Sequence, residues 1–294
     1  MTATNIAPEA ELRSGIVEVG RRLWMRGFVA SNDGNISVRI GPDRLLMTPA
    51  SVSKGFMSPE MMVITDLDGT LVSGAPGRKP SSEIQMHIVA YRHRPDIGAV
   101  VHAHPPLATG FAVAGIALDR AVLAEVVTTL GSIPIAEYGT PSTRELAAAV
   151  APYVTAHDGL LLANHGALAL GADLFGAYYK METIEHFARI SLVARQLGGE
   201  QLLSREEVMR LQNLRGTYGI AAPAPICADP PPAGADPNCQ VVVAPSAPGE
   251  QLVPPSAQGS FDGLIGTDGE IRLTYGQLTA LIDEVVKQVG AAQR

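Results

Sequence analysis

Two short apolar segments that carry histidines place the tightest constraint on the fold of this chain. Residues 98–106 (GAVVHAHPP) form an apolar run between Gly98 and Pro105, and residues 159–171 (GLLLANHGALALG) form the most strand-like segment, with a break at residues 164–166. Short apolar runs bounded by Gly or Pro are typical of buried strands. We therefore expect both segments to lie as strands in the interior of a β-sheet.

The rest of the first 219 residues divides into helices and closely spaced strands. Between residues 31 and 74, turn residues separate short strand-like segments, which predicts an antiparallel meander rather than successive β–α–β units. In the longer segments, apolar residues recur at helical spacing. Helices are expected over residues 9–30, 84–94, 107–115, 143–154 and 173–198, with another helix beginning at Ser204 and another strand over residues 132–138.

The composition of the chain changes after Gly219. Residues 220–260 are rich in Pro and Ala and have little periodicity, which is typical of a linker. Residues 261–294 end in a predicted amphipathic helix with one apolar stripe, formed by Leu278, Leu281, Ile282, Val285, Val286 and Val289. We therefore expect a domain over residues 1–219, a linker over residues 220–260 and a C-terminal tail over residues 261–294.

Charge and hydropathy exclude several classes of partner. The formal net charge of −7 gives no basic surface for nucleic acid and disfavours anionic lipid. The sequence has no run of about 18 apolar residues that could span a membrane. Its first residues lack the basic region and apolar core of a secretory signal, so we expect a cytoplasmic protein.

The histidines of the two apolar segments suggest a metal site. His102 and His104 are two residues apart, so in a strand their side chains point to the same face. A pair of solvent-facing histidines is the simpler alternative, but two unpaired imidazoles would be costly to bury in so apolar a strand. His165, at the break in the other segment, could be the third ligand. Three neutral histidines suit zinc with an open coordination position, and Mn²⁺ or Co²⁺ could use the same nitrogens.

The start of the helix expected after residue 83 suggests an anion site. Ser81, Ser82 and the free N–H groups of the helix start could hold a phosphate, with Asn35 offering an amide donor from another segment. Glu83 could then act as a general acid/base beside a metal. The alternatives are that Glu83 is only a favourable charge at a helix N-terminus and that Asn35 belongs to a plain turn. His87 could orient Glu83, although a packed helix histidine is the favoured interpretation.

Seven motifs together resemble one protein family. The segments are GNIS (34–37), TPAS (48–51), PSSE (80–83), VVHAH (100–104), STRELA (142–147), NHG (164–166) and TYG (217–219). Their order and spacing resemble the class II aldolase/adducin family, and within it most closely the L-fuculose-phosphate aldolase branch. The resemblance covers about residues 10–219, which makes the domain over residues 1–219 the expected catalytic domain.

The resemblance implies an α/β fold, with α/β/α layers around a mainly antiparallel central sheet. It also implies a homotetramer with active sites between subunits and one Zn²⁺ per chain. The implied reaction is retro-aldol cleavage of a ketose 1-phosphate, of the L-fuculose- or L-rhamnulose-phosphate type, to dihydroxyacetone phosphate and an aldehyde such as lactaldehyde. The implied site residues are the metal ligands His102, His104 and His165, the acid/base and additional metal ligand Glu83, the phosphate ligands Asn35, Ser51, Ser81 and Ser82, and the catalytic Tyr218.

Two departures from the aldolase pattern leave alternatives open. Ala50 and Ser51 replace a Thr-Gly pair of the phosphate loop, and residues 121–131 lack the Tyr that donates a proton on the aldehyde side. A sugar-phosphate dehydratase or 4-epimerase of the same family is therefore an alternative, although Glu83 stands where the epimerases have Asp. A non-catalytic, adducin-like interaction module is a second alternative, against which the intact histidine set argues.

The C-terminal segment resembles a different kind of sequence. A Pro/Ala-rich linker followed by a short amphipathic helix is similar to the encapsulation peptides of bacterial microcompartment cargo enzymes. That resemblance implies a microcompartment shell protein as a partner of residues 261–294 and the microcompartment lumen as a possible location. The alternative is that the helix docks on its own tetramer.

Overall fold

The structure is a computed structural model that describes residues 7–218 and residue 220. The predicted tail and, except for Ile220, the predicted linker lie outside the described residues. The described part of the chain belongs to one compact unit. No helix within it is both long enough and apolar enough to cross a membrane.

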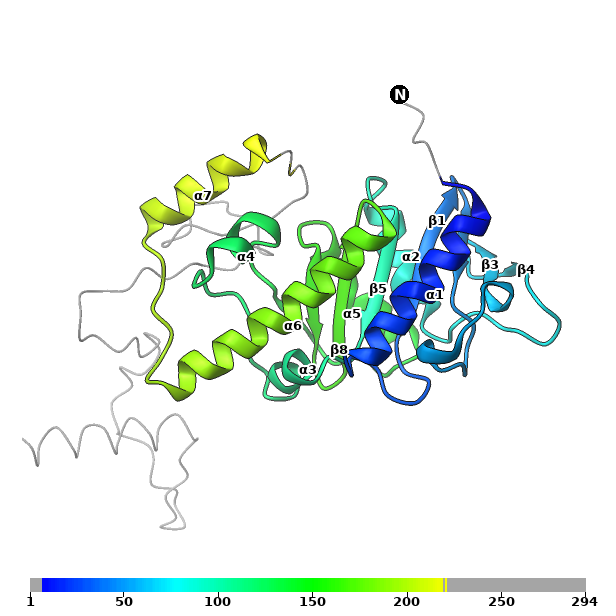
Figure 1. Ribbon diagram of the computed structural model, residues 1–294, viewed down its shortest axis with the longest axis horizontal. Coiled ribbons are helices and arrows are strands. Elements are labelled where there is room, and N and C mark those ends of the chain that lie inside the picture. Colours follow the sequence, from blue (N-terminus) through cyan, green and yellow to red (C-terminus); the bar gives the residue numbers. More distant parts are fainter. Residues whose placement is uncertain (1–6, 219, 221–294) are drawn as a thin grey trace, which may run out of the picture. The chain divides into compact units, whose positions relative to one another are not determined.

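An eight-stranded sheet runs through the middle of the domain in the order β4-β3-β2-β1-β5-β8-β7-β6 (Figure 1). Neighbouring strands are antiparallel except for the parallel pair β6–β7, so the predicted mainly antiparallel sheet is confirmed. The predicted meander is the run of β1 to β4. The strands are β1 Asn35–Gly41, β2 Arg44–Met47, β3 Val63–Asp66, β4 Leu71–Ser73, β5 Ala99–Ala103, β6 Ile135–Ala136, β7 Gly159–Leu162 and β8 Gly166–Gly171.

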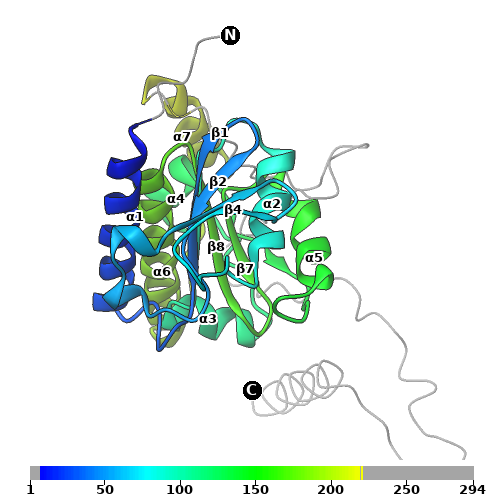
Figure 2. The same cartoon turned by 90° about the vertical axis from the view of Figure 1, so that its right-hand side faces the viewer.

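Helices cover both faces of the sheet, which gives the predicted α/β/α layers (Figure 2). Helices α1, α3 and α6 pack on one face, and α2 and α5 pack on the other. Helix α7 packs on α4. The helices are α1 Glu9–Met25, α2 Ile84–His93, α3 Pro106–Val113, α4 Ala124–Thr129, α5 Arg144–Val154, α6 Leu174–Gln196 and α7 Arg205–Thr217, with short 3-10 turns η1 Lys54–Phe56 and η2 Pro59–Met61.

The two faces of the buried strands explain why their sequences are almost entirely apolar. In β5, Val101 packs with the α1 and α6 side of the core, whereas Val100 packs with the α2 and α5 side. In β8, Ala169 and Leu170 divide in the same way. Side chains alternate along a strand, so a strand covered on both faces has no polar row.

The structure differs most clearly from the sequence-based expectations in three places. Helix α1 ends at Met25 rather than residue 30, because Gly27 adopts φ +70° and the Phe28 N–H bonds the Leu23 carbonyl at 2.9 Å, which closes the helix. The strand expected over residues 132–138 is only β6. The segment 159–171 is not one interrupted strand but two antiparallel strands, because Asn164 turns the chain with φ +55°.

The strand register brings distant segments together at one end of the sheet. Asn35, at the start of β1, is paired with His102 near the end of β5. Ala103 of β5 is paired with Ala167 near the start of β8. The start of β1, the end of β5 and the β7–β8 turn therefore meet, and the candidate site lies there.

Candidate metal and substrate site

Three histidines form a compact cluster at this end of the sheet. His102 belongs to β5, His104 follows β5, and His165 lies in the β7–β8 turn. Their ring centroids are 4.8–5.0 Å apart, and one nitrogen from each lies within 4.8 Å of the others. The Nε2 atoms of His102 and His104 are 3.1 Å apart. The structure thus brings together the three histidines that the sequence singled out.

The surroundings of His102 keep its imidazole neutral. His102 is fully buried, and burial lowers its pKa to about 3, outweighing the opposing attraction of the Glu83 carboxylate. Its Nδ1–H donates to the Ala167 carbonyl oxygen at 2.9 Å. Nε2 therefore carries a free lone pair, the form in which histidine binds a metal. The Asp33 carboxylate lies 3.5 Å from Nδ1 of His104, a position from which it can orient that second imidazole.

Glu83, the residue just before α2, completes the cluster. Its Oε2 lies 3.4 Å from His102 Nε2, and its Oε1 lies 3.2 Å from His165 Nε2. Burial by itself would raise the pKa of Glu83, but the interactions with His102 and His165 and the hydrogen bond from Asn35 leave that pKa well below its usual range. The carboxyl group is therefore ionised.

These four side chains fit a divalent cation. Among the described residues, neither Glu83 Oε1 nor His165 Nδ1 has a hydrogen-bond partner, although both atoms are buried. A buried carboxylate oxygen that lies 3.2 Å from an imidazole nitrogen is in the environment of a metal ligand. Three His nitrogens with a carboxylate suit tetrahedral Zn²⁺, and the same donors accept Mn²⁺ or Co²⁺.

A row of buried hydrogen bonds holds Glu83 against the sheet. Glu83, His87 and Tyr91 follow one another at intervals of four residues, from the N-cap of α2 along the helix, so they lie on one face, which faces β1. On β1, Asn35 and Ser37 are two residues apart and lie on the same side of the strand. The Asn35 Nδ2 group donates to Glu83 Oε2 at 2.8 Å, and Asn35 Oδ1 bonds His87 Nε2. His87 Nδ1 lies 2.7 Å from Ser37 Oγ, which lies 3.0 Å from the Tyr91 hydroxyl oxygen.

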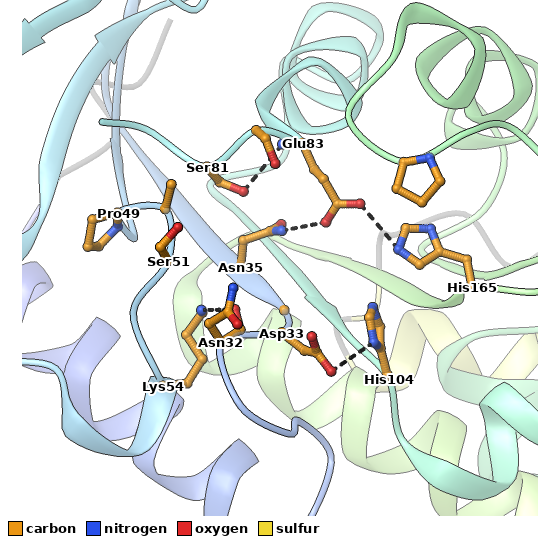
Figure 3. A pocket seen from close by; sticks show the side chains of 14 residues that line it. Asn32, Asp33, Asn35, Pro49, Ser51, Lys54, Ser81, Glu83, His104 and His165 are labelled. Carbon is orange, nitrogen blue, oxygen red and sulfur yellow. Dashed lines mark hydrogen bonds and ion pairs between the residues drawn. The ribbon is translucent and has the colours of Figure 1, made fainter. Parts of the chain in front are cut away.

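A cavity of about 390 Å³ opens beside Glu83 (Figure 3). Seven of the sequence-predicted site residues line it: Asn35, Ser51, Ser81, Ser82, Glu83, His104 and His165. The Ser81 hydroxyl accepts a hydrogen bond from the Glu83 N–H at 3.3 Å, so it turns toward the start of α2. The Ser82 hydroxyl accepts one from Ser142 at 2.7 Å. Hydroxyls beside a helix N-terminus can bind the oxygens of an anion.

Tyr218 does not join the other predicted residues within the single chain. It caps the C-terminal end of α7, the residue is 64% exposed, and it does not line the cavity. A role for Tyr218 in a site between subunits remains a prediction.

The sequence analysis missed several residues that line the cavity, above all Lys54, and treated Asn32 and Asp33 only as turn residues. The available signal for Lys54 was its place three residues after the TPAS motif, inside an otherwise uncharged segment.

Comparisons with known proteins agree with this geometry. The family model described as "Class II Aldolase and Adducin N-terminal domain" matches residues 14–192. A 5-deoxy-D-ribulose 1-phosphate aldolase from Bacillus thuringiensis is 32% identical over 70% of this chain and 96% of its own. A 3-oxo-tetronate 4-phosphate decarboxylase from Haemophilus influenzae is 30% identical over 67% of this chain and 94% of its own.

The fold comparison points to the same group of proteins. The solved structure of an L-fuculose 1-phosphate aldolase superposes with a TM-score of 0.65 and 30% identity, covering 72% of this chain and 98% of that one. The histidine cluster, the adjoining carboxylate and the serine-lined cavity lie in the segment that the family model matches. The chain belongs to the class II aldolase and adducin family.

Proposed function

We propose that this protein is a metal-dependent lyase that splits a ketose 1-phosphate by retro-aldol cleavage. The observation that carries the proposal is the ionised Glu83 carboxylate, placed between the three-histidine cluster and the hydroxyl-lined cavity. A retro-aldolase needs a group that stabilises negative charge, a proton carrier and a handle on the phosphate. These needs match the three parts of the site.

Each part of the site has a role in the proposed reaction. His102, His104 and His165 would hold the metal, together with Glu83 while no substrate is bound. A bound divalent cation supplies Lewis-acid stabilisation of negative charge on substrate oxygen. The C3–C4 bond breaks, its electron pair stays on C3, and the C4 hydroxyl becomes the aldehyde as its proton passes to the ionised Glu83 carboxylate. Glu83 then carries that proton to C3, and Asn35, Ser51, Ser81 and Ser82 hold the phosphate.

The names of two relatives support a substrate class. L-fuculose 1-phosphate and 5-deoxy-D-ribulose 1-phosphate, the compounds in the names of two matched aldolases, are both ketose 1-phosphates. Cleavage between C3 and C4 gives dihydroxyacetone phosphate from either, and only the aldehyde differs. We propose a substrate of the L-fuculose- or L-rhamnulose-phosphate type, with lactaldehyde as the second product.

The test is a retro-aldol assay on the purified full-length protein loaded with zinc. L-fuculose 1-phosphate, L-rhamnulose 1-phosphate and 5-deoxy-D-ribulose 1-phosphate are supplied separately, and dihydroxyacetone phosphate is followed by coupled reduction. We expect release from at least one substrate, its loss with a chelator, and its loss in a Glu83→Gln variant that keeps its metal. Absence of release from all three by metal-loaded protein would contradict the proposal.

A decarboxylase, a dehydratase or a 4-epimerase is the second candidate. The Haemophilus influenzae relative is named as a decarboxylase of a 3-oxo acid phosphate, and decarboxylation likewise leaves an electron pair on carbon beside a carbonyl. The absence of Tyr from residues 121–131 also favours chemistry that releases no aldehyde. Carbon dioxide or an isomerised sugar phosphate, without dihydroxyacetone phosphate, would support this candidate. A protein that binds no metal would instead support the adducin-like alternative.

We further propose a homotetramer in which Tyr218 reaches the site of a neighbouring subunit. The exposure of Tyr218 on the single chain supports this placement. The tail over residues 261–294 is proposed, from its sequence pattern alone, to bind a microcompartment shell protein. The proposed locations are accordingly the cytoplasm and the microcompartment lumen.

A further inference from the structure

Lys54 is a buried cation at the wall of the cavity, and two of its three N–H donors are used in hydrogen bonds to the protein. The residue is only 2% exposed, although it lines the cavity. Its ammonium group donates to the carbonyl oxygens of Asn32 at 3.0 Å and Val52 at 2.7 Å. An ammonium group has three N–H donors. The third has no hydrogen-bond partner in the described part of the chain.

The backbone that carries Lys54 is fixed by close packing. A Cβ atom at Gly20 of α1 would lie 2.9 Å from the Lys54 carbonyl oxygen and 2.3 Å from Cε of Met57. Only a glycine lets η1 approach α1 so closely, so the position of Lys54 depends on it. In Figure 3 the side chain rises from η1, and its ammonium group lies on the side of the cavity that carries Ser51.

The charges around the cavity suit this cation to binding an anion. Among the described residues that line the cavity, Lys54 is the one Lys or Arg, and the carboxylates Asp33 and Glu83 also line it. The serine hydroxyls and the α2 N-terminus donate hydrogen bonds but carry no full charge. A phosphate monoester carries a charge of about −1.5 to −2 at neutral pH. Binding it beside two carboxylates needs positive charge on the phosphate side as well as at the metal.

Lys54 also remains charged at neutral pH. Burial lowers its pKa to about 8, and the nearby Asp33 and Glu83 carboxylates oppose that shift. The group is therefore mainly an ammonium at pH 7, as an anion ligand must be.

We propose that Lys54 binds the phosphate group of the substrate through its third N–H and thereby selects phosphorylated over unphosphorylated sugars. The inference rests on the proposed function only in taking a sugar phosphate as the ligand. It makes Lys54 a binding residue that adds charge to the neutral Ser51, Ser81 and Ser82 group.

The test compares Lys54→Met with Lys79→Met in the full-length, zinc-loaded protein. Methionine keeps most of the aliphatic stem of Lys54 and removes the charge and the donors. Lys79 is an exposed lysine whose carbonyl bonds the Ala50 N–H in the same loop region, but it does not line the cavity. Inorganic phosphate is titrated by calorimetry, and KM and kcat are measured with the best ketose 1-phosphate.

Lys54→Met should weaken phosphate binding and raise KM by about 10- to 100-fold, since a hydrogen bond to a charged group is worth about 1.5–3 kcal/mol. The kcat value should change far less, and Lys79→Met should stay within about twofold of wild type. Equal phosphate affinity in wild type and folded Lys54→Met would overturn the inference.

A second measurement does not depend on the folding of the variant. A crystal structure of the wild-type, zinc-loaded protein with inorganic phosphate should place a phosphate oxygen within hydrogen-bond distance of Lys54 Nζ. Phosphate held by Ser81 and Ser82 but out of reach of Nζ would overturn the inference. If the aldolase assay fails but phosphate affinity still depends on Lys54, only the proposed function is contradicted and the inference about Lys54 stands.

Discussion

The ionised state of Glu83 determines which atoms carry the protons in the row of hydrogen-bonded residues from Glu83 to Ser37. An ionised Glu83 can only accept, so the Asn35 amide must turn its NH₂ group toward Glu83 and its oxygen toward His87. His87 must then carry its proton on Nε2, and its Nδ1 accepts from the Ser37 hydroxyl. His87 is therefore a positioning residue, which fixes the Asn35 amide that in turn holds Glu83.

Replacing His87 should slow the reaction without removing metal or substrate. His87→Leu abolishes the donor to Asn35, which lets the amide turn and releases Glu83, so we expect kcat to fall by about 10- to 100-fold. His87→Gln can still donate to Asn35 and should recover much of that loss. Metal content and KM should stay near wild type in both variants. Equal kcat values for the Leu and Gln variants would count against a positioning role.

The same histidine should make the protein sensitive to acid. Full burial lowers the pKa of His87 from 6.5 to about 4. Between these pH values the unfolded chain binds a proton that the folded chain does not, so stability decreases as the pH falls from 6.5 to 4. At about 1.4 kcal/mol per pH unit, the loss from this group is about 3 kcal/mol.

Chemical unfolding of wild type and His87→Leu from pH 7 to pH 4 isolates this contribution. The leucine variant has no proton to bind at residue 87, so the difference in unfolding free energy between the two proteins should shrink by about 3 kcal/mol toward pH 4. A difference that stays constant with pH would show that the pKa of His87 is not lowered in the folded protein.

Among the secondary-structure elements, the β7–β8 hairpin acts directly on the geometry of the candidate metal site. His165 lies in its turn. Gly166, the first residue of β8, lies close to the His102 and His104 side chains. A Cβ atom at Gly166 would lie 2.6 Å from the Ala103 carbonyl oxygen and 2.6 Å from Cδ2 of His104. The hairpin and β5 can thus approach only because residue 166 has no side chain.

Gly166→Ala should therefore weaken metal binding. The added methyl group pushes His104 away from His102, so we expect at least about tenfold lower zinc affinity and about 1–3 kcal/mol lower stability of the apoprotein. Gly110→Ala is the matched control, since a Cβ there has no neighbour within 4 Å, and this variant should match or exceed the stability of wild type. Zinc affinity is measured by competition with a chromogenic chelator. Unchanged affinity in Gly166→Ala would mean that the histidine geometry tolerates the shift.

The elements also show what the sequence could and could not predict. The spacing of His102 and His104 predicted their shared face, and the break in the segment 159–171 identified His165, because both are local properties of strands. The hairpin turn at Asn164 was not predicted, since it depends on a backbone conformation that the apolar pattern does not encode. Lys54 and Asp33 were missed because only the packing of η1 and the 31–34 loop around β1 brings them to the cavity.

At the scale of the whole molecule, the described domain contains every predicted site residue. The cavity is lined by residues between Asn32 and His165, and even Tyr218 precedes the predicted linker. The sequence resemblance and the family match both end before the linker, at about residue 219 and at residue 192. Catalysis and the proposed shell binding are therefore expected to be separable along the chain.

Removal of residues 220–294 should accordingly leave the catalytic constants within about twofold of those of the full-length protein. Among the described residues, every side chain that lines the cavity is retained, and the helices and strands of the described domain end at Thr217. The comparison uses zinc-loaded proteins in the retro-aldol assay, with full-length Glu83→Gln as the inactive reference. Co-purification with a microcompartment shell protein should be seen for the full-length chain and not for the truncated one. Complete loss of catalysis in a truncated protein that still folds and binds zinc would show that the tail contributes to the active site, as a helix docked on its own tetramer could.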